Sequence, residues 1–527
     1  MATSVQLLGL PLTVFRLILD LLNRDDVDTI RLVSKACGEA TEYVFFRKIA
    51  LHDLSPSAEG INSRIWARLC DPQDALLHHV RHLQIGLFEQ ETHLPSEQTL
   101  VAVLGSLEHL QDFSWNARFP IPKGVLSALS TKWPAARLHV TNFDRREPKY
   151  LPLDTALLSS PQLYSLAYLV CGTIWNSQNE LDELRSEFGQ LRTCLLQTKR
   201  LKSLHLTAWP NMRLDENPHV DDSAWTTGPG NLDFREGDVF PALEELILPC
   251  DNYSLSRAHC QQWLAAMDWS HMRRLDFGNG CPREPMAALI GRVPQLKCFC
   301  FGFDPIFVQE TVGVTEQESP SLYMIGEFLD GIEGLEEVIV NSVSSSWSMF
   351  NFTTISLCGK HGRTLKKLRL HYGVRSEIKG WSLEEVRGLV ERCPGLEDLA
   401  LRVTLDLTTP VPGCGMWSAP IVTEIQKLLP LRRLELETEV KYGRKVAQPS
   451  QFLNEADALK SAAALLRYLL NGKANTLVGE MIVKFVPTRP FFGPQDTEYI
   501  VARKAECATR FEVETMIHDQ GFWRSPA

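Results

Sequence analysis

The stretch Cys393–Leu401, CPGLEDLAL, shows the pattern that decides the fold of this 527-residue chain. A proline turn is followed by three apolar residues, Leu396, Leu399 and Leu401. The last two are two positions apart and therefore share one face of a short strand, while the first turns the chain into that strand. Just before this stretch, Ser382–Arg392 has the apolar spacing of a helix. The unit predicted here is a helix followed by a strand.

The same apolar spacing returns along the chain from Val80 onward, every ~25–45 residues, which is a period typical of solenoid repeats. Further units are Val80-Leu83-Ile85, Leu110-Phe113-Trp115, Leu163-Leu166-Tyr168, Leu201-Leu204-Leu206, Leu243-Leu246-Leu248, Met272-Leu275-Phe277, Leu296-Phe299-Phe301, Leu335-Val338-Val340, Leu365-Leu368-Leu370 and Leu431-Leu434-Leu436. Weaker copies are Ala135-Leu138-Val140 and Val478-Met481-Val483. Helical stretches precede several units, as at Ser256–Met267 and Ala456–Leu470.

Strands that alternate with helices stack into a parallel sheet with helices outside. We therefore predict an α/β fold whose body is a solenoid with the strands inside. Leu204, Leu246, Leu368 and Leu399 are predicted to be interior. The alternative is an ordinary α/β sheet of separate strands.

Residues 8–51 form a different, N-terminal stretch with three predicted helices. Proline at the first helical position loses no hydrogen bond, so Pro11 starts a helix that runs to about Leu22. On this helix Val14, Ile18 and Leu22 form one stripe, with Phe15 and Leu19 beside them. Asp26 is predicted to cap the second helix, on which Val27, Ile30 and Val33 pack back on the first. The third helix carries Ala40, Val44 and Phe45.

The apolar residues of the first helix spread around much of its circumference: Leu12, Phe15, Leu17, Leu19 and Leu21. Three short helices offer too little core to bury them all, so we expect part of this surface to meet another protein. The alternative is that the helices only cap the N-terminal end of the following domain.

These residues resemble the F-box, which docks on a Skp-type adaptor of a cullin-RING ubiquitin ligase. The resemblance rests on Leu10-Pro11, Val14, Ile18-Leu19, Leu22, Asp25-Asp26, Leu32-Val33-Ser34-Lys35 and Phe46-Arg47-Lys48-Ile49. Thr13 stands where the family usually has an acidic residue. The resemblance implies binding to the adaptor, and through it to a cullin scaffold. The residues expected to bind the adaptor are Leu10, Pro11, Val14, Ile18, Leu19, Leu22 and Val33.

The body is similar to the irregular leucine-rich-repeat domains of fungal F-box proteins, although it lacks an asparagine ladder and its period varies. The resulting domain prediction is an F-box-like helical motif at 8–51, a helical linker at 52–79, the leucine-rich-repeat-like solenoid at 80–488 and a C-terminal cap at 489–527. A cap is expected because an uncovered solenoid end exposes its core.

Composition excludes some function classes and points to a compartment. A net charge of −10 and a pI near 5.8 argue against nucleic-acid binding, which depends on clustered lysine and arginine. The N-terminus lacks a secretory signal, and no apolar run approaches the ~20 residues that span a bilayer. Thirteen cysteines without framework spacing indicate free thiols in a reducing compartment. We expect a cytoplasmic or nuclear protein, or one present in both compartments, that binds no membrane.

No catalytic motif emerges. Gly472-Lys473 lacks the flanking residues of a phosphate loop, and neither a nucleophile elbow nor a zinc pattern is present. We interpret Cys298 and Cys300 as surface thiols rather than as a pair of metal ligands. His78, His79 and His82 are polar residues at the edge of the first predicted strand. We expect no enzyme activity, no cofactor and no metal.

Charged residues between the core positions provide a binding face. Lys367, Arg369 and His371 lie on one face of one predicted strand, and Arg402 and Arg433 are expected at like positions on the next two. Such a basic cluster would bind an acidic or phosphorylated segment of a target protein; the alternative is a solvated face. The function expected from the resemblance is substrate recognition in a Skp/cullin/F-box ubiquitin ligase. The alternative is an interaction scaffold without ligase coupling.

Overall fold

The computed structural model describes residues 10–22, 24–52, 61–86, 94–117, 119–142, 153–171, 187–209, 231–249, 253, 255–280, 282–302, 320–343, 357–372, 380–404, 419–428, 430–440, 465, 480–487, 497–504 and 511–518. The chain divides into two compact units. The first comprises Met1–Glu245, Asn252–Ser254 and Ala265–Asp268, and the second comprises Leu246–Asp251, Leu255–Leu264 and Trp269–Ala527.

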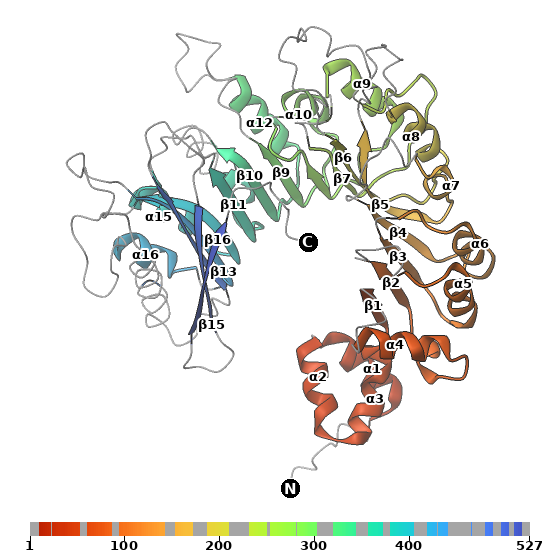
Figure 1. The fold of residues 1–527 in the computed structure, drawn as a ribbon. Helices are drawn as coiled ribbons and strands as arrows, with labels where there is room; N and C mark the ends of the chain where they lie inside the picture. The colour runs from red at the N-terminus through yellow and green to blue at the C-terminus, as the bar shows by residue number, and fades with distance from the viewer. Residues whose placement is uncertain are drawn as a thin grey trace. The chain divides into compact units, whose positions relative to one another are not determined.

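The first unit begins with three short helices, α1 (Leu12–Leu21), α2 (Arg24–Val33) and α3 (Lys35–Phe45) (Figure 1). Helix α1 starts directly after Pro11, one residue later than predicted, with Pro11 at the N-cap position. The predicted cap at Asp26 is wrong, because this residue lies inside α2. A side-chain cap is found instead on α3, where the Ser34 hydroxyl accepts a hydrogen bond of 3.1 Å from the Cys37 amide.

A parallel sheet follows in the first unit, and neighbouring strands pair in chain order. Its strands are β1 (Lys48–His52), β2 (His82–Gly86), β3 (Asp112–Asn116), β4 (Arg137–Asn142), β5 (Leu163–Cys171) and β6 (Ser203–Trp209). Strand β1 was not predicted, although Phe46, Ile49 and Leu51 have the spacing of the repeat units and are all buried.

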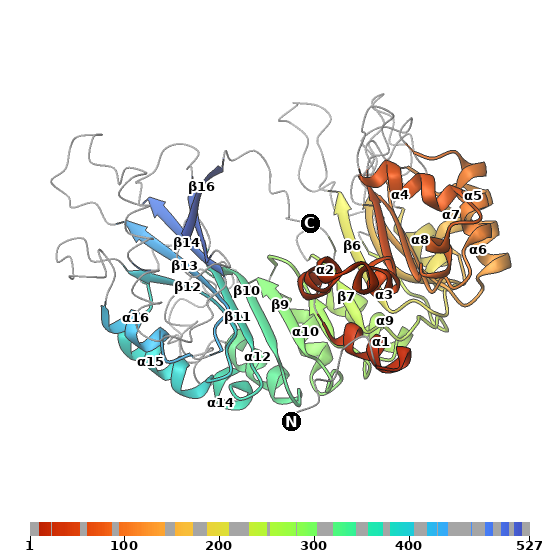
Figure 2. The ribbon, with the colours of Figure 1, turned by 90° about the horizontal axis from the view of Figure 1, so that it is seen from below.

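Helices cover one face of this sheet. The predicted linker contains α4 (Ile61–Cys70) and the 3-10 helix η2 (Ala75–His78). Next come α5 (Glu97–Ser106), α6 (Lys123–Lys132), α7 (Thr155–Leu158) and α8 (Phe188–Leu195), which lie on one side of the strands (Figures 1 and 2). The opposite face, called here the open strand face, carries the side chains that alternate with the core positions. Strand β7 (Glu245–Ile247) and α9 (Arg257–Ala266) fall where the chain passes between the two units.

The second unit repeats the arrangement. Its parallel strands are β8 (Arg274–Asp276), β9 (Cys298–Gly302), β10 (Glu337–Val343), β11 (Lys367–Tyr372), β12 (Asp398–Thr404), β13 (Arg433–Val440) and β14 (Glu480–Pro487). Its helices are α10 (Arg283–Leu289), α12 (Pro320–Asp330), α14 (Cys358–His361), α15 (Leu383–Arg392) and α16 (Ala419–Ile425). Within the predicted cap, β15 (Thr497–Lys504) and β16 (Phe511–His518) continue the sheet as antiparallel strands.

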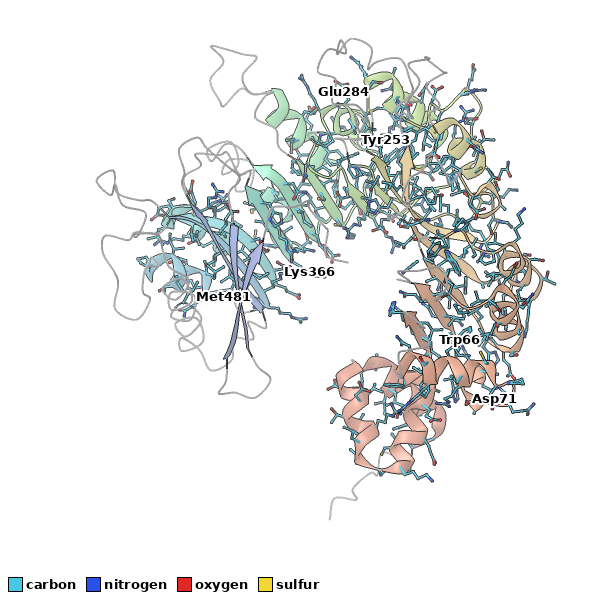
Figure 3. The ribbon with its side chains drawn as sticks, viewed as in Figure 1. Trp66, Asp71, Tyr253, Glu284, Lys366 and Met481 are labelled. Atoms are coloured by element: carbon cyan, nitrogen blue, oxygen red, sulfur yellow. The ribbon has the colours of Figure 1, made fainter. Side chains whose placement is uncertain are left out.

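The strand register stacks the apolar positions of the repeat into columns. In the second unit, one column consists of fully buried side chains that lie opposite one another on successive strands: Leu275, Phe299, Val338, Leu368, Leu399, Leu434 and Met481. Met481, the last of the column, is labelled in Figure 3. The predicted interior positions Leu204, Leu246, Leu368 and Leu399 are confirmed. Ala135 is wrong as a core position, because its neighbour Ala136 is buried instead. The α/β fold with parallel strands inside and helices outside is thereby confirmed.

Two of the predicted helices are found within two residues of their expected ends, at α9 and α15. Ser382 and Glu385 form a reciprocal capping box at the start of α15. Apart from Leu465, the predicted helix at Ala456–Leu470 lies outside the described residues, as does Val478. No described helix has both the length and the apolar character needed to cross a bilayer.

The core column predicts a large difference between two leucine truncations. Leu399→Ala removes a fully buried side chain and is expected to lower the free energy of unfolding by ~2–5 kcal/mol. Leu32→Ala removes an exposed side chain and should change it by less than ~0.5 kcal/mol. Urea unfolding followed by circular dichroism measures both. Equal losses would contradict the assigned core.

Candidate functional site

Helix α1 has a buried side and an exposed apolar side. Successive residues of a helix are rotated by about 100°, so positions three and four apart share a face. Phe15 and Leu19 are buried on one side. Val14, Leu17 and Leu21 lie on the other, with exposed fractions of 41%, 64% and 86%. On α2, Leu32 and Val33 are also exposed, at 87% and 71%, and these five residues are called here the N-terminal apolar surface.

The structure changes the list of residues available to an adaptor. Pro11, Val14 and Val33 are exposed, and Leu10, Ile18 and Leu22 are half-buried. Leu19 was wrongly assigned to adaptor contact, because its side chain is fully buried in the chain itself. The predicted packing of Val33 against the first helix is also wrong, because this side chain is exposed.

Leu17, Leu21 and Leu32 are exposed apolar residues that the predicted adaptor-binding set does not contain. The sequence did carry a signal for Leu17 and Leu21, because apolar residues spread around much of the circumference of α1. What the sequence did not decide was which side of that circumference the other helices cover.

Stacked cations join α2 to α3, and α4 to the residue that follows α3. The guanidinium of Arg31 lies 4.3 Å from the ring centroid of Phe45, and that of Arg68 lies 5.1 Å from the ring of Phe46. Arg68 also donates two hydrogen bonds, of 2.8 and 2.9 Å, to the carboxylate of Asp74. These hydrogen bonds lower the pKa of Asp74, whose carboxylate in turn caps η2 through the Leu76 amide.

On the open strand face of the second unit, the predicted basic residues lie on strands β11, β12 and β13, and each is close to a carboxylate. Lys367 Nζ is 3.2 Å from Glu337 Oε2. Arg369 donates two hydrogen bonds, of 3.1 and 2.6 Å, to Asp398.

The remaining three predicted residues are paired as well. Arg402, only 3% exposed, donates from Nε to Glu437 Oε1 at 3.0 Å. His371 Nδ1 and Arg433 Nη2 each lie 3.9 Å from a carboxylate oxygen of Glu435. The face is therefore a balanced ion-pair network and not a free basic cluster, and an incoming phosphate would compete with carboxylates already in place.

The expected equivalence of Arg402 and Arg433 is also wrong. In the observed register Arg433 lies opposite Asp398, and Arg402 lies opposite Glu437. The two arginines therefore occupy different rows of the sheet. Each faces an opposite charge on the neighbouring strand, an arrangement that stabilises cross-strand pairs.

Cys298 and Cys300 lie on the same face but are buried, so the prediction of surface thiols is wrong. Cys298 Sγ is 3.8 Å from Glu337 Oε2, and Asn341 donates to Cys300 Sγ at 3.4 Å. Burial raises the pKa of the Cys298 thiol to about 11 and raises that of Cys300 as well, so both are protonated at neutral pH and weakly reactive. Within the described ranges, no three histidine, cysteine or acidic side chains gather in a way that could hold a metal.

The open strand face of the first unit carries a compact polar cluster around Asp112. This carboxylate accepts two hydrogen bonds from Arg137, of 2.6 and 2.8 Å, and lies 2.9 Å from His139 Nε2. The Arg137 guanidinium lies 5.1 Å from the ring centroid of Tyr164. On the neighbouring strand β2, His82 Nε2 is 2.7 Å from Ser114 Oγ.

In this cluster the pKa values of Asp112 and His82 both lie below their ordinary values. Burial acts to raise the pKa of Asp112, but hydrogen bonds and positive charge from Arg137 and His139 outweigh it and hold the pKa below its ordinary value. Burial lowers the pKa of His82 to about 4, so this imidazole is neutral at pH 7. Because Asp112 binds His139 while Ser114 binds His82, the four residues do not form a serine-histidine-aspartate relay. They form a preorganised surface for hydrogen bonding.

The fold is that of a parallel strand-and-helix repeat protein, and the comparisons with known proteins add little to this description. No family model matches the sequence, and no curated protein matches it. Twenty-five chains of solved structures match, among them a chain in the crystal structure of the Rad7 and Elc1 complex in yeast. That chain is 14% identical, the match covers 72% of this chain and 76% of that one, and the TM-score is 0.36.

The lowered pKa of Asp112 predicts an acid-dependent contribution to stability. A carboxyl group with a lower pKa in the folded state stabilises the fold fully above its unfolded pKa, near 4, and loses this effect as the pH falls through the folded value. Asp112→Asn should therefore destabilise the protein at pH 7, and the difference from wild type should shrink below pH 4. Thermal unfolding across this pH range measures it. The exposed Glu333→Gln variant is the control, and a pH-independent difference for Asp112→Asn would contradict the prediction.

The pair Arg369 and Asp398 predicts measurable coupling. Each side chain is 18% exposed, so removing one takes a close opposite charge away from a partly buried group. Arg369→Ala and Asp398→Ala are each expected to cost ~1–3 kcal/mol, with the double variant costing clearly less than their sum. A double-mutant cycle by urea unfolding tests this. The exposed pair Arg387 and Glu384 should couple by only ~0.3–0.5 kcal/mol, and equal coupling in both pairs would refute the ranking.

Proposed function

We propose that this chain is the substrate-recognition subunit of a Skp/cullin/F-box-type ubiquitin ligase. In this proposal helices α1 to α3 form an F-box that docks on a Skp-type adaptor and, through it, on a cullin scaffold. The repeats form an irregular leucine-rich-repeat domain that holds a target protein. The chain catalyses no reaction itself, and ubiquitin transfer is accelerated because the target is held close to a separate conjugating enzyme.

The observation that carries the proposal is the N-terminal apolar surface. Five large apolar side chains remain exposed on two short helices whose sequence resembles the F-box. Large apolar side chains left exposed on one side of a helix, as Val14, Leu17 and Leu21 are on α1, are typical of protein interaction sites, where a few desolvated anchors supply most of the binding energy. The proposal identifies this surface as the adaptor interface and adds Leu17, Leu21 and Leu32 to its residues.

Target binding is assigned to the open strand faces. There the side chains are already fixed by ion pairs and hydrogen bonds, as around Asp112 and between Arg369 and Asp398. Preorganised groups lose less conformational entropy when a partner binds. In keeping with its free thiols and its acidic composition, the protein is proposed to act in the cytoplasm, the nucleus or both.

The decisive experiment is adaptor capture by the purified full chain. Leu17→Asp combined with Leu21→Asp should weaken binding of a recombinant Skp-type adaptor by at least about tenfold, because charge replaces two apolar anchors. Val239→Asp, at a position in the first unit that is 77% exposed, is the matched control and should bind like wild type. Surface plasmon resonance gives the affinities, and circular dichroism checks the fold.

Two results would count against the proposal. Unchanged adaptor binding by the double variant would remove the N-terminal apolar surface from the interface. Adaptor binding by wild type without incorporation into a cullin complex, tested by reconstitution, would instead favour the alternative of an interaction scaffold without ligase coupling.

A further inference from the structure

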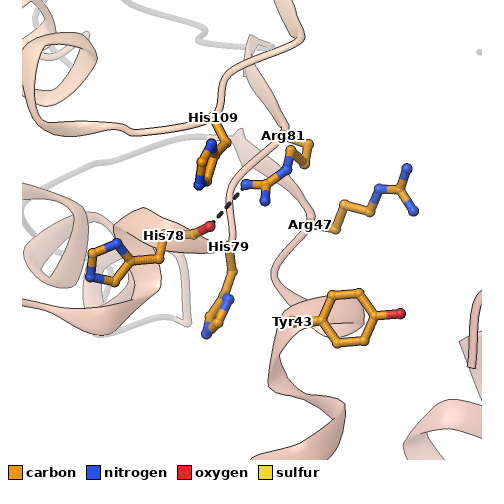
Figure 4. A pocket seen from close by; sticks show the side chains of 6 residues that line it. All are labelled: Tyr43, Arg47, His78, His79, Arg81 and His109. Atoms are coloured by element: carbon orange, nitrogen blue, oxygen red, sulfur yellow. Dashed lines mark hydrogen bonds between the residues drawn. The ribbon is translucent and has the colours of Figure 1, made fainter. Parts of the chain in front are cut away.

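A pocket of about 330 Å³ lies in the first unit where α3 meets the first two repeats. None of its lining residues is acidic, although the chain as a whole has a net charge of −10. The lining consists of Tyr43, Arg47, His78, His79, Arg81 and His109 (Figure 4). Tyr43 comes from α3 and His78 from η2, while the other four come from the segments that lead into strands or follow η2.

The strand register brings the two arginines together. The Arg47 carbonyl accepts hydrogen bonds of 2.9 Å from the amides of both Arg81 and His82. The Arg81 carbonyl in turn accepts from Gln111 and Asp112, at 2.8 and 3.0 Å. Arg47 and Arg81 are therefore equivalent positions on neighbouring strands, which lie ~4.8 Å apart.

The same repetition places two of the histidines. His79 precedes Arg81 by two residues, and His109 precedes Gln111 by two, so they are equivalent positions of successive repeats. In Figure 4 the ring of His109 lies above, and that of His79 below, the hydrogen bond from Arg81 to the His78 carbonyl. The pocket is thus built by the repeat itself, in two rows of cationic or proton-donating side chains.

Two side chains of the pocket have defined polar contacts. Arg81 Nη1 donates to the carbonyl oxygens of His78, at 2.8 Å, and Val80, at 3.4 Å, which fixes the guanidinium within the wall (Figure 4). His78 Nδ1 lies 2.7 Å from Glu108 Oε2. Arg47 and Arg81 therefore add two permanent positive charges to the lining, with their guanidinium groups pointing to opposite sides in Figure 4, and the histidines and Tyr43 add further donors.

We propose that this pocket binds the phosphate groups of a phosphorylated small molecule. The planar guanidinium fork matches the oxygens of a phosphate and can donate two parallel hydrogen bonds to it. Imidazole and phenol groups supply additional donors. The volume lies at the lower end of the range for small-molecule sites, which suits a compact ligand.

The position of the pocket gives the bound anion a structural role. A ligand that contacts Tyr43 and both arginines touches α3 and the first two strands at once. Because a ligand that binds only the folded state stabilises that state, its binding raises the stability of the junction between the helices and the sheet. This inference is independent of the proposed adaptor binding.

The test is isothermal titration calorimetry of the full chain with inorganic pyrophosphate, at an ionic strength of about 0.15 M, where long-range attraction is screened. Saturable binding with one site per chain is expected. Arg47→Gln should weaken it by at least about tenfold, and Arg47→Lys by less, because lysine keeps the charge but not the fork. Arg292→Gln, at an exposed arginine in the second unit, is the matched control and should bind within about twofold of wild type.

A second ligand identifies the source of the phosphate. A short phosphoserine peptide should bind more weakly than pyrophosphate, and tighter binding of the peptide would overturn the small-molecule assignment. His109→Gln provides a second variant at the opposite wall and should also weaken pyrophosphate binding. The proposal fails if pyrophosphate shows no saturable binding, or if Arg47→Gln and His109→Gln, with wild-type circular dichroism spectra, bind it as tightly as wild type does.

Discussion

The structure depends on one hydrogen-bond arrangement that recurs at the start of its strands. The carbonyl of the residue just before a strand accepts two amides from the next repeat, as Lys366 does from Glu397 and Asp398. Carbonyls in the same arrangement belong to Arg47, Arg81, Lys202, Arg273, Lys297, Glu336 and Glu397. These paired hydrogen bonds fix the register of the strands that they connect. A slip of one residue would exchange the two faces of a strand and expose the core residues of that strand.

The same register determines the chemistry of the open strand face. Charged residues on neighbouring strands are brought within a few ångströms of one another, so unlike charges must alternate from strand to strand. Outside the core column, Lys366 and Glu336 follow the rule with Nζ and Oε2 2.7 Å apart. Arg369 and Asp398 follow it on the sheet itself. A face ordered in this way is charge-balanced and rigid, which favours specific recognition over general attraction.

Periodicity predicted the core because the two-residue spacing of a strand is visible in a single sequence. The strand Lys48–His52 was missed even though Phe46, Ile49 and Leu51 carry that spacing, because the neighbouring residues read as the end of a helical motif. The ion pairs were not predictable, since loops of different lengths separate the strands and hide which charge lies opposite which. The pocket could not be predicted either, because Arg47 and Arg81 are recognised as equivalent positions only once β1 is known to be a strand.

The N-terminal helices show why a short helical segment leaves apolar side chains in solvent. Helix α1 has ten residues, and on one of its sides Phe15 and Leu19 are buried in the core. Leu17 and Leu21 lie on the opposite side of the helix, where they are exposed. Only two residues separate the end of α3 at Phe45 from the start of β1 at Lys48, and the stacking of Arg68 on Phe46 braces this connection. The short connection and this contact therefore restrict how α3 can move relative to the first strand of the unit.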